Sequence, residues 1–216
     1  MLNLVRQKSR GDTLIEVLFA TATFSLVAVG GLAVMNQGTA ASQRAIEITL
    51  VRNEIDAQAE TLRFLNASYI AAYQAGISDY GTNTPAGQWQ LMHDSIIATG
   101  AVSASPFGAV GLSCPTPTQG SFILNAKNAT FVAPTDDKLA PSQTFAQVNY
   151  AEISGQPVVS SANGIWIEAV RSATVAANNQ VNTGYIDFNI RACWESSGQA
   201  TPATIGTIVR LYEPRG

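Results

Sequence analysis

The chain has 216 residues, enough for one moderate domain with an extended element or for two small domains. Charged residues make up only 12% of it, about half the usual share for a soluble globular protein, so an ordinary soluble domain is disfavoured. Three Trp, eight Phe and six Tyr supply large groups to bury, which argues against a disordered chain.

The formal net charge of −3 is unevenly distributed. Arg6, Lys8 and Arg10 lie in the first ten residues, with no acidic residue among them. In the remaining chain nine basic residues stand against fifteen acidic ones, a net charge of −6. A surface of this sign repels phosphate backbones, so we predict no nucleic-acid binding by the body of the protein.

Residues 1–11 are basic and polar, and residues 12–35 are nearly all apolar. The apolar stretch is longer than the 7–15-residue core of an ordinary secretory signal. As a helix, Val17 to Met35 would be about 28 Å long, close to the hydrocarbon thickness of a bilayer. The basic flank holds the N-terminus in the cytoplasm. We therefore expect a single-pass membrane protein whose body, after about Asn36, lies outside the cytoplasmic membrane.

Glu16 lies inside the apolar end of this predicted span. A carboxylate there costs about 2.5–3.5 kcal/mol on insertion scales, so it needs a partner or a role. One interpretation is a boundary residue that reaches the headgroups or pairs with Arg10. The surrounding residues suggest another.

Residues 11–16 read GDTLIE, after a basic leader and before a charge-free apolar span. This combination resembles the processing site of type IV prepilins and type II secretion pseudopilins, and the resemblance covers roughly the first forty residues. It implies that a prepilin peptidase cuts after Gly11, that the mature chain begins at Asp12, and that the new N-terminus is methylated. It also implies that Glu16 pairs with the N-terminal ammonium of a neighbouring subunit. Such a pair acts mainly as a register device, because a buried ion pair penalises mispairing more than it stabilises.

The resemblance also implies partners: other pilin subunits in a helical homo- or hetero-filament, an inner-membrane assembly platform, and the membrane before assembly.

Two positions depart from the family pattern. Asp12 stands where an aromatic residue or Met is usual, and Ala33 stands where many members have Pro. Gly30–Gly31 is then the remaining weak point of the helix. These departures favour a minor or atypical subunit.

Residues 40–75 continue in helical style and carry an apolar stripe at spacings of three and four. The stripe comprises Ile48, Val51, Ile55, Ala59, Leu62, Leu65, Tyr69 and Tyr73. One helix from Asp12 to Ala75, ending near Gly76, would be about 95 Å long. Packing of residues 40–75 on the chain's own domain is favoured over a dimerising coiled coil, because the run is short and lacks Leu-rich heptads.

We predict a connecting loop over residues 76–120, with a short helix around Trp89 to Thr99, and a β-sheet domain over residues 121–216. Tyr185 to Trp194 alternates apolar residues with Asp187, Asn189 and Arg191, which is typical of a half-buried strand. The other expected strands are Thr204 to Tyr212, its antiparallel partner, then Ile165 to Val170 and, more weakly, Ser121 to Leu124 and Phe145 to Ile153. The fold class is α+β: a long N-terminal helix, transmembrane in residues 12–39, whose second half packs on a C-terminal antiparallel sheet. The resemblance implies the same architecture, the pilin fold.

Cys114 and Cys193 both follow the predicted span. An even cysteine count outside the cytoplasm favours one disulfide over two separate buried thiols. Closing so long a loop would contribute about 4 kcal/mol in the chain-entropy model.

Catalysis is not indicated. His93 is the lone histidine, and a serine in a nucleophile elbow is missing. Neither cysteine has metal-ligand spacing, and Asp136–Asp137 is more typical of a solvated turn than of a calcium site. Trp166 and Trp194 are expected in the core. We predict no enzymatic activity, no cofactor and no metal.

The leading hypothesis is thus a structural subunit of a type IV pilus-like filament at the cell surface (a fimbrium). The alternatives are a pseudopilin of a type II secretion or DNA-uptake machine, which would form a periplasmic fibre, and an uncleaved single-pass surface binding protein.

Overall fold

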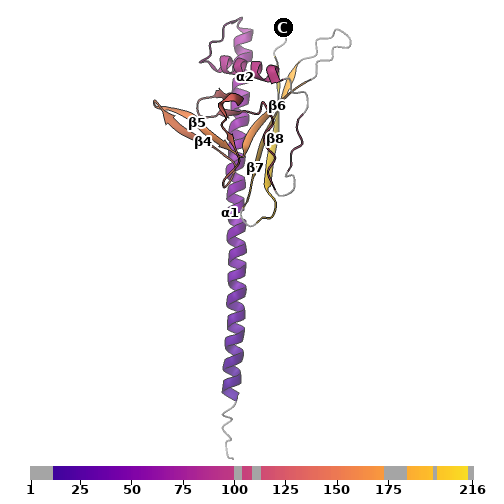
Figure 1. Cartoon of the computed structure of the whole chain (residues 1–216). Coiled ribbons are helices and arrows are strands. Elements are labelled where there is room, and N and C mark those ends of the chain that lie inside the picture. The colour runs from indigo at the N-terminus through magenta and orange to yellow at the C-terminus, as the bar shows by residue number, and fades with distance from the viewer. Residues whose placement is uncertain (1–11, 100–103, 109–112, 173–183, 197–198, 214–216) are drawn as a thin grey trace, which may run out of the picture. The chain divides into compact units, whose positions relative to one another are not determined.

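The structure, a computed structural model, describes residues 12–99, 104–108, 113–172, 184–196 and 199–213. It has the predicted α+β architecture, with a long N-terminal helix followed by antiparallel sheet (Figure 1). The chain divides into two compact units, Met1–Arg44 and Ala45–Gly216. The first contains the apolar half of the long helix, and the second contains its amphipathic half with all the strands.

Helix α1 runs without interruption from Asp12 to Gln74, so the predicted weak point at Gly30–Gly31 does not break it. Its C-terminus is closed by two backbone hydrogen bonds. The Gly76 N–H donates to the Tyr73 carbonyl at 3.0 Å, and the Ile77 N–H donates to the Ala72 carbonyl at 3.1 Å. This pair of bonds is a Schellman motif, and it confirms the predicted end of the helix near Gly76.

The strands among the described residues form three small sheets rather than one. The strands are β1 Ile123–Asn125, β2 Thr130–Val132, β3 Leu139–Ala140, β4 Gln147–Ile153, β5 Gln156–Asn163, β6 Ile165–Arg171, β7 Tyr185–Trp194 and β8 Ala203–Tyr212. A short 3-10 helix, Pro134–Asp136, lies between β2 and β3. The sheets are ordered β1-β2, β3-β5-β4 and β6-β7-β8, and β7 pairs antiparallel with both β6 and β8. The predicted strands at β6, β7 and β8 are therefore confirmed, whereas β5 and its hairpin with β4 were not predicted.

The chain passes from the second sheet to the third through a single residue, Gly164. Its φ is +66°, and a Cβ there would lie 2.4 Å from the carbonyl oxygen of Cys193. Only glycine fits both the left-handed backbone and the close approach. This junction places the end of β5 directly beside the end of β7.

The core forms where the apolar stripe of α1 meets the sheets. Val51, Ile55, Ala59, Leu62 and Leu65 are at most 3% exposed. Packed with them are Trp89 from helix α2 and the apolar side chains of β1, β6 and β7. The stripe is confirmed as far as Tyr69, but Tyr73 is 37% exposed and lies outside the core.

Helix α2 spans Pro85–Thr99 and begins four residues before the predicted start at Trp89. Thr84 causes the earlier start, because its hydroxyl oxygen accepts the Gly87 N–H at 3.1 Å. Pro85 occupies the first helical position, where its missing N–H costs nothing. The two residues together are a helix-start signal.

The prediction that β7 is half-buried is wrong for its second half. Asn189 is 7% exposed and Arg191 is 5% exposed, although both point away from α1. Residues 104–108, which we call the strap, cover this outer face of the sheet through Ser105 and Phe107. Both faces of β7 are therefore buried there.

Candidate functional site

The first half of α1 presents an apolar surface on which no residue with a described position packs. Every side chain from residue 13 to residue 39 is exposed. The large apolar ones, among them Phe19, Phe24 and Leu26, are 60–76% exposed. The described part of the chain contains one helix long and apolar enough to cross a membrane, and its mean hydropathy reaches 2.1. A single membrane span at the N-terminus is consistent with this helix.

The hydroxyl groups in the middle of this segment are satisfied within the helix itself. Thr21 donates to the Leu18 carbonyl at 3.0 Å, Thr23 donates to the Phe19 carbonyl at 2.9 Å, and Ser25 donates to the Thr21 carbonyl at 2.7 Å. Hydrocarbon offers no hydrogen bonds, so a spanning segment must satisfy its polar groups internally. These side chains meet that condition.

Glu16 does not. It is the one charged residue between residues 13 and 43, it is exposed, and no described side chain pairs with it. Asp12 is the first residue of α1, and its side chain is outside the described part of the chain, as is all of Gly11. The roles of Gly11 and Asp12 in processing therefore remain predictions. Within one copy, the structure brings no partner to Glu16 from residues 13–99, 104–108, 113–172, 184–196 and 199–213.

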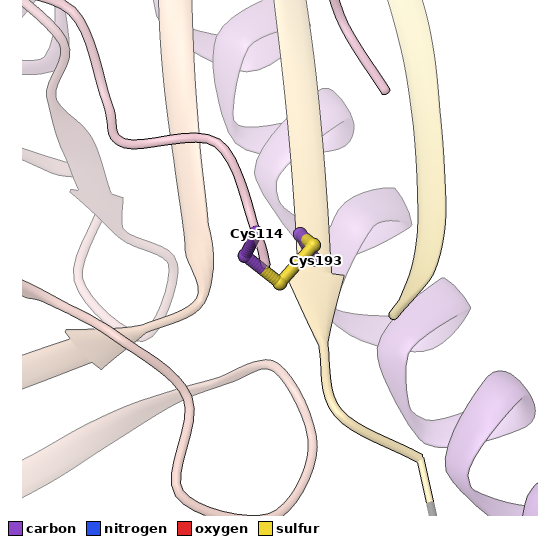
Figure 2. Close-up of a disulfide and its surroundings, with 2 residues drawn as sticks. All are labelled: Cys114 and Cys193. Carbon is purple, nitrogen blue, oxygen red and sulfur yellow. A yellow bond between two sulfur atoms is a disulfide. The ribbon is translucent and has the colours of Figure 1, made fainter. Parts of the chain in front are cut away.

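The predicted disulfide is present (Figure 2). Cys114 and Cys193 are bonded, with their Cα atoms 5.7 Å apart and 79 residues apart in sequence. The bond joins the connecting region to the end of β7, as the sequence predicted. Cys193 is fully buried and Cys114 is half-buried.

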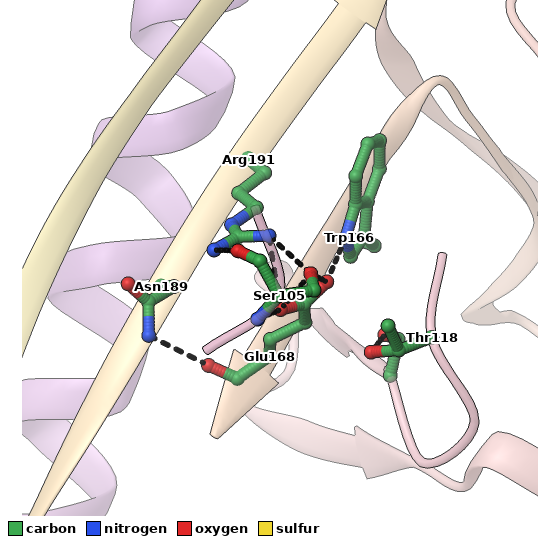
Figure 3. Close-up of polar contacts among 7 residues, drawn as sticks. Ser105, Thr118, Trp166, Glu168, Asn189 and Arg191 are labelled. Atoms are coloured by element: carbon green, nitrogen blue, oxygen red, sulfur yellow. Dashed lines mark hydrogen bonds and ion pairs between the residues drawn. The ribbon is translucent and has the colours of Figure 1, made fainter. Parts of the chain in front are cut away.

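A second attachment holds the strap to the same sheet (Figure 3). Arg191 and Glu168 form an ion pair at 3.0 Å, and each side chain is 6% exposed. The Ser105 hydroxyl donates to both carboxylate oxygens of Glu168 at 2.8 Å. Arg191 donates through Nη1 to that hydroxyl at 2.7 Å and through Nη2 to the Ser105 carbonyl at 2.8 Å. Trp166 Nε1 donates to the same carboxylate at 3.2 Å.

Aromatic packing completes this cluster. The Arg191 guanidinium lies 5.0 Å from the ring centre of Phe107, whose ring meets the Trp166 ring edge-on at 6.1 Å. No buried side-chain polar atom of the described residues lacks a hydrogen-bond partner. Since the oxygens of Glu168 already accept from three side chains, the cluster acts as a clasp for the strap rather than as a reactive group.

On the other face of the sheet, two side chains of α1 bind the body. The carboxylate of Glu47 accepts from Trp194 Nε1 at 3.1 Å and from the Ser196 hydroxyl at 2.7 Å. Gln58 is fully buried, and its amide bonds both the N–H and the carbonyl of Leu124 at 3.0 Å. Gln58 thus pairs with β1 as a neighbouring strand would.

One acid of α1 is perturbed by its surroundings. Burial raises the pKa of Glu54 above its ordinary value of 4.5, while a hydrogen bond from Gln58 and the charge of Lys127 act in the opposite direction. Burial likewise raises the pKa of Tyr150, and the nearby charge of Glu54 adds to that rise. Lys127 lies over the Tyr150 ring, 4.3 Å from its centre. The group joins α1 to β4 and to the turn after β1.

The remaining sequence candidates fall into structural roles. His93 Nε2 lies 2.8 Å from Glu213 Oε1, which joins α2 to the residue after β8. Asp136 and Asp137 lie at an exposed turn, and no group of three metal-ligating side chains occurs among the residues with defined positions. Trp166 and Trp194 are at most 2% exposed, so their predicted place in the core is confirmed.

Sequence reasoning missed the clasp, although a signal for it existed. Glu168 interrupts the apolar run IWIEAV, and Arg191 interrupts NIRACW in the predicted neighbouring strand. Opposite charges in two adjacent apolar strands predict a buried pair.

Comparison with protein-family models, with curated proteins and with solved structures finds no match to this chain.

Proposed function

We propose that this chain is a minor or atypical subunit of a type IV pilus-like surface filament, processed after Gly11 and assembled through the first half of α1. The observation that carries the proposal is an exposed apolar helix segment, residues 13–43, whose one carboxylate, Glu16, has no partner among the described residues of its own chain. Apolar surface left in water costs about 25 cal/mol per Å². This surface therefore needs a cover, first from lipid and then from the helices of other copies.

The helix suits both environments without refolding. The hydroxyls of Thr21, Thr23 and Ser25 are bonded to the backbone of the same helix, and the backbone bonds of the helix are internal, so both lipid and packed helices suit it. Transfer from bilayer to filament then exchanges one apolar cover for another. The single group that distinguishes the two states is the Glu16 carboxylate.

An ammonium at a new N-terminus supplies the missing partner. Cleavage after Gly11 would place a positive charge at the start of α1, where the helix dipole disfavours it and a carboxylate offsets that cost. In a stack of parallel helices, Glu16 of one subunit meets this ammonium of another at one axial offset only. A membrane anchor that never assembles would have no use for this arrangement.

The mature N-terminus tests the proposal. The full chain is produced in a host with a prepilin peptidase and a filament-assembly system, and its N-terminal peptide is identified by mass spectrometry. We expect a chain beginning at Asp12, found in the sheared filament fraction at few copies relative to the main subunit. A chain beginning at Met1 and confined to membranes would favour an uncleaved surface protein instead.

Glu16→Ala tests the charge pair separately. We expect normal membrane insertion and cleavage, but loss of the subunit from filaments. Thr21→Ala is the matched control, because Thr21 is exposed on the same helix and its hydroxyl bonds only its own backbone. Incorporation of Glu16→Ala at the level of the control would rule out the pairing.

A further inference from the structure

Strand β8 is the outer strand of the β6-β7-β8 sheet. All ten of its residues pair with β7, and no other strand of the described residues lies on its far side. An unpaired strand edge presents a row of backbone N–H and C=O groups to which another chain can bind. We call this far side of the strand the β8 edge.

The hydrogen bonds at the end of the ladder show which groups the β8 edge presents. The Glu213 N–H donates to the Gly184 carbonyl at 3.0 Å, one pair beyond the last pair of β7 and β8. Because bonded and non-bonded pairs alternate in an antiparallel ladder, every second residue of β8 directs its N–H and C=O away from β7. These residues are Thr204, Gly206, Ile208, Arg210 and Tyr212. The Tyr212 carbonyl agrees with this direction, since it accepts from Asn66 of α1 at 3.4 Å.

The first four of these residues leave their outward groups open. The structure forms no hydrogen bond to these N–H and C=O groups from any residue that it describes. All four residues are exposed, and Ile208 is 66% exposed. We call Thr204, Gly206, Ile208 and Arg210 the outward residues.

Other sheet edges in the described structure are protected. Strand β3 is only two residues long, and the pairing of β4 shifts register between Asn149 and Tyr150. Along β6, Phe122 exchanges two backbone hydrogen bonds with Ile167, at 3.1 and 2.8 Å. Short strands, bulges and covering segments are the usual means by which proteins keep an edge from binding another strand.

Strand β8 has neither a short length nor a bulge. Its pairing with β7 is regular from end to end, and its sequence ATIGTIVRLY contains neither Pro nor Lys. Its one charged side chain, that of Arg210, reaches back over β7, where it bonds Asp187 at 2.7 Å and stacks on the ring of Tyr185. The charge is thus directed away from the β8 edge, and it leaves room for another strand.

We propose that the β8 edge takes a fourth strand from a different subunit of the filament; this contact rests on the proposed function. The partner must be an extended backbone, because that geometry meets N–H and C=O groups that point outward at every second residue. The row of β8 side chains that faces the core indicates the side chains of the partner. Ile205 and Leu211 are half-buried at the rim of the core, and Val209 between them is 4% exposed. Apolar side chains at alternating positions of the added strand would extend the core at this rim.

A second copy of this chain does not suit the β8 edge. At the start of β8, Ala203 pairs with Trp194, whose Nε1 donates to Glu47 of α1. At the end of β8, Tyr212 accepts from Asn66, so β8 runs in the same direction as α1. Antiparallel pairing of two β8 edges would point the α1 helices of the two copies in opposite directions, although both start in the same membrane. The net charge of −6 after the leader adds repulsion between copies, whereas a different protein carries neither restriction.

Hydrogen exchange at single amides tests the added strand. The full chain is compared in purified filaments and in detergent micelles, and electron-transfer fragmentation reads each amide of β8 by mass spectrometry. We expect the amides of the outward residues to exchange at least about tenfold more slowly in filaments, because they gain hydrogen bonds. Amides that already bond β7, such as those of Thr207 and Val209, should keep their rates. Equal slowing of both sets would indicate general burial and would overturn the proposal.

Proline removes one outward N–H and leaves the N–H groups that bond β7 intact. Ile208→Pro should lower the filament content of the subunit several-fold, because the added strand loses a donor and meets the proline ring. Ile208→Thr is the matched control, since it removes the apolar side chain but keeps the N–H, and it should assemble like the parent. Equal losses in the two variants would contradict backbone pairing. Unfolding in detergent micelles is measured for both, and if Ile208→Pro unfolds the body, Thr204→Pro near the start of the strand takes its place.

A photo-crosslinker identifies the chain that supplies the strand. With p-benzoylphenylalanine in place of Ile208, irradiation of filaments should join this chain to a different filament subunit, and peptide mapping should place the bond in an extended segment with alternating apolar residues. A product made of two copies of this chain would overturn the choice of partner.

The outcomes separate the two proposals. If filaments contain the chain but its outward residues exchange at the micelle rate, the added strand is overturned and the proposed function stands. If the chain is absent from filaments, the proposed function fails, and the same exchange measurement on membranes of the producing cells decides the strand. Slowing of the outward residues alone would there support strand addition by a different protein, whereas unchanged rates would overturn it.

Discussion

The ion pair of Glu168 and Arg191 has both partners removed from water, since each side chain is 6% exposed. Burial of a charge costs several kcal/mol unless an opposite charge and hydrogen bonds compensate it. Here Ser105 and Trp166 supply the remaining hydrogen bonds. Removal of one charge therefore leaves the other uncompensated.

We expect Glu168→Gln to lower the free energy of unfolding by about 3–5 kcal/mol, the range for breaking one side of a buried pair. The measurement is denaturant unfolding of the full chain in detergent micelles, followed by tryptophan fluorescence. Glu60→Gln is the control, because Glu60 pairs with Arg63 on the surface and surface pairs contribute about 0–1 kcal/mol. Equal losses in the two variants would show that the clasp does not hold the strap.

Glu54 predicts a dependence of stability on pH. Burial raises its pKa in the folded state, so folding favours the protonated form. That contribution is fully present below the unfolded value of about 4.5 and is lost as the pH rises through the folded value. Glu54→Gln removes the titration, so we expect the variant to be more stable than the parent at pH 7 and the difference to shrink toward pH 4.

The check is a series of unfolding midpoints for both proteins between pH 4 and pH 8. Glu152→Gln is the control, because Glu152 is exposed and unpaired among the described residues. A parent–variant difference for Glu54 that stays constant across this pH range would contradict the role of burial.

The role of a residue could be predicted from the sequence where it depends on neighbouring residues or on the number of residues of one type, such as cysteine. Cys114 and Cys193 follow from an even number of cysteines outside a predicted membrane, and the structure joins them. The roles of Asn189 and Arg191 could not be predicted in the same way. Alternation in β7 indicates which side chains share a face, but burial of the second face depends on Ser105, 86 residues before Arg191.

At the scale of elements, α1 is the most predictable part of the chain. Its apolar period fixed the buried stripe, and Gly76 marked its end. The strand that the sequence did not predict is β5, because Pro157 and Ser160–Ser161 are residues typical of turns. Pairing with β4 on one side and β3 on the other stabilises β5, and neither pairing is visible in its own sequence.

Gln58 shows why the role of a polar residue within a helix depends on tertiary contacts. It lies within the apolar face of α1, yet its amide bonds the backbone of Leu124 twice at 3.0 Å. Gln58→Leu would leave the Leu124 N–H and carbonyl buried without partners, at about 1–3 kcal/mol for each unsatisfied group. We expect lower stability and faster hydrogen exchange at the Leu124 amide.

Hydrogen exchange with mass spectrometry, read on peptides that contain β1, measures this effect. Gln74→Leu is the control, because Gln74 is an exposed residue at the end of the same helix. If β1 exchanges at the parent rate in Gln58→Leu, then β1 is held by the sheets and not by α1.

At the scale of the whole molecule, the chain divides into Met1–Arg44 and Ala45–Gly216, and the two units differ in what stabilises them. In the first unit, every described side chain from residue 13 to residue 39 is exposed, so this part of the helix has no core, and under the proposed function lipid or other copies cover it. The second has a core, a disulfide and the clasp. Processing and folding should therefore respond to different substitutions.

We expect Cys114→Ser with Cys193→Ser to destabilise the second unit by about 4 kcal/mol, because the bond closes a loop of 79 residues in the unfolded chain. Membrane insertion and the mature N-terminus should be unchanged, since neither cysteine lies in the first unit. Glu16→Ala should do the reverse, with normal unfolding of the body and loss of assembly. Unfolding curves and N-terminal mass spectrometry on both variants measure the two effects together. Loss of N-terminal processing in the cysteine variant would mean that the body must fold before the leader is removed, and the two units would then act as one.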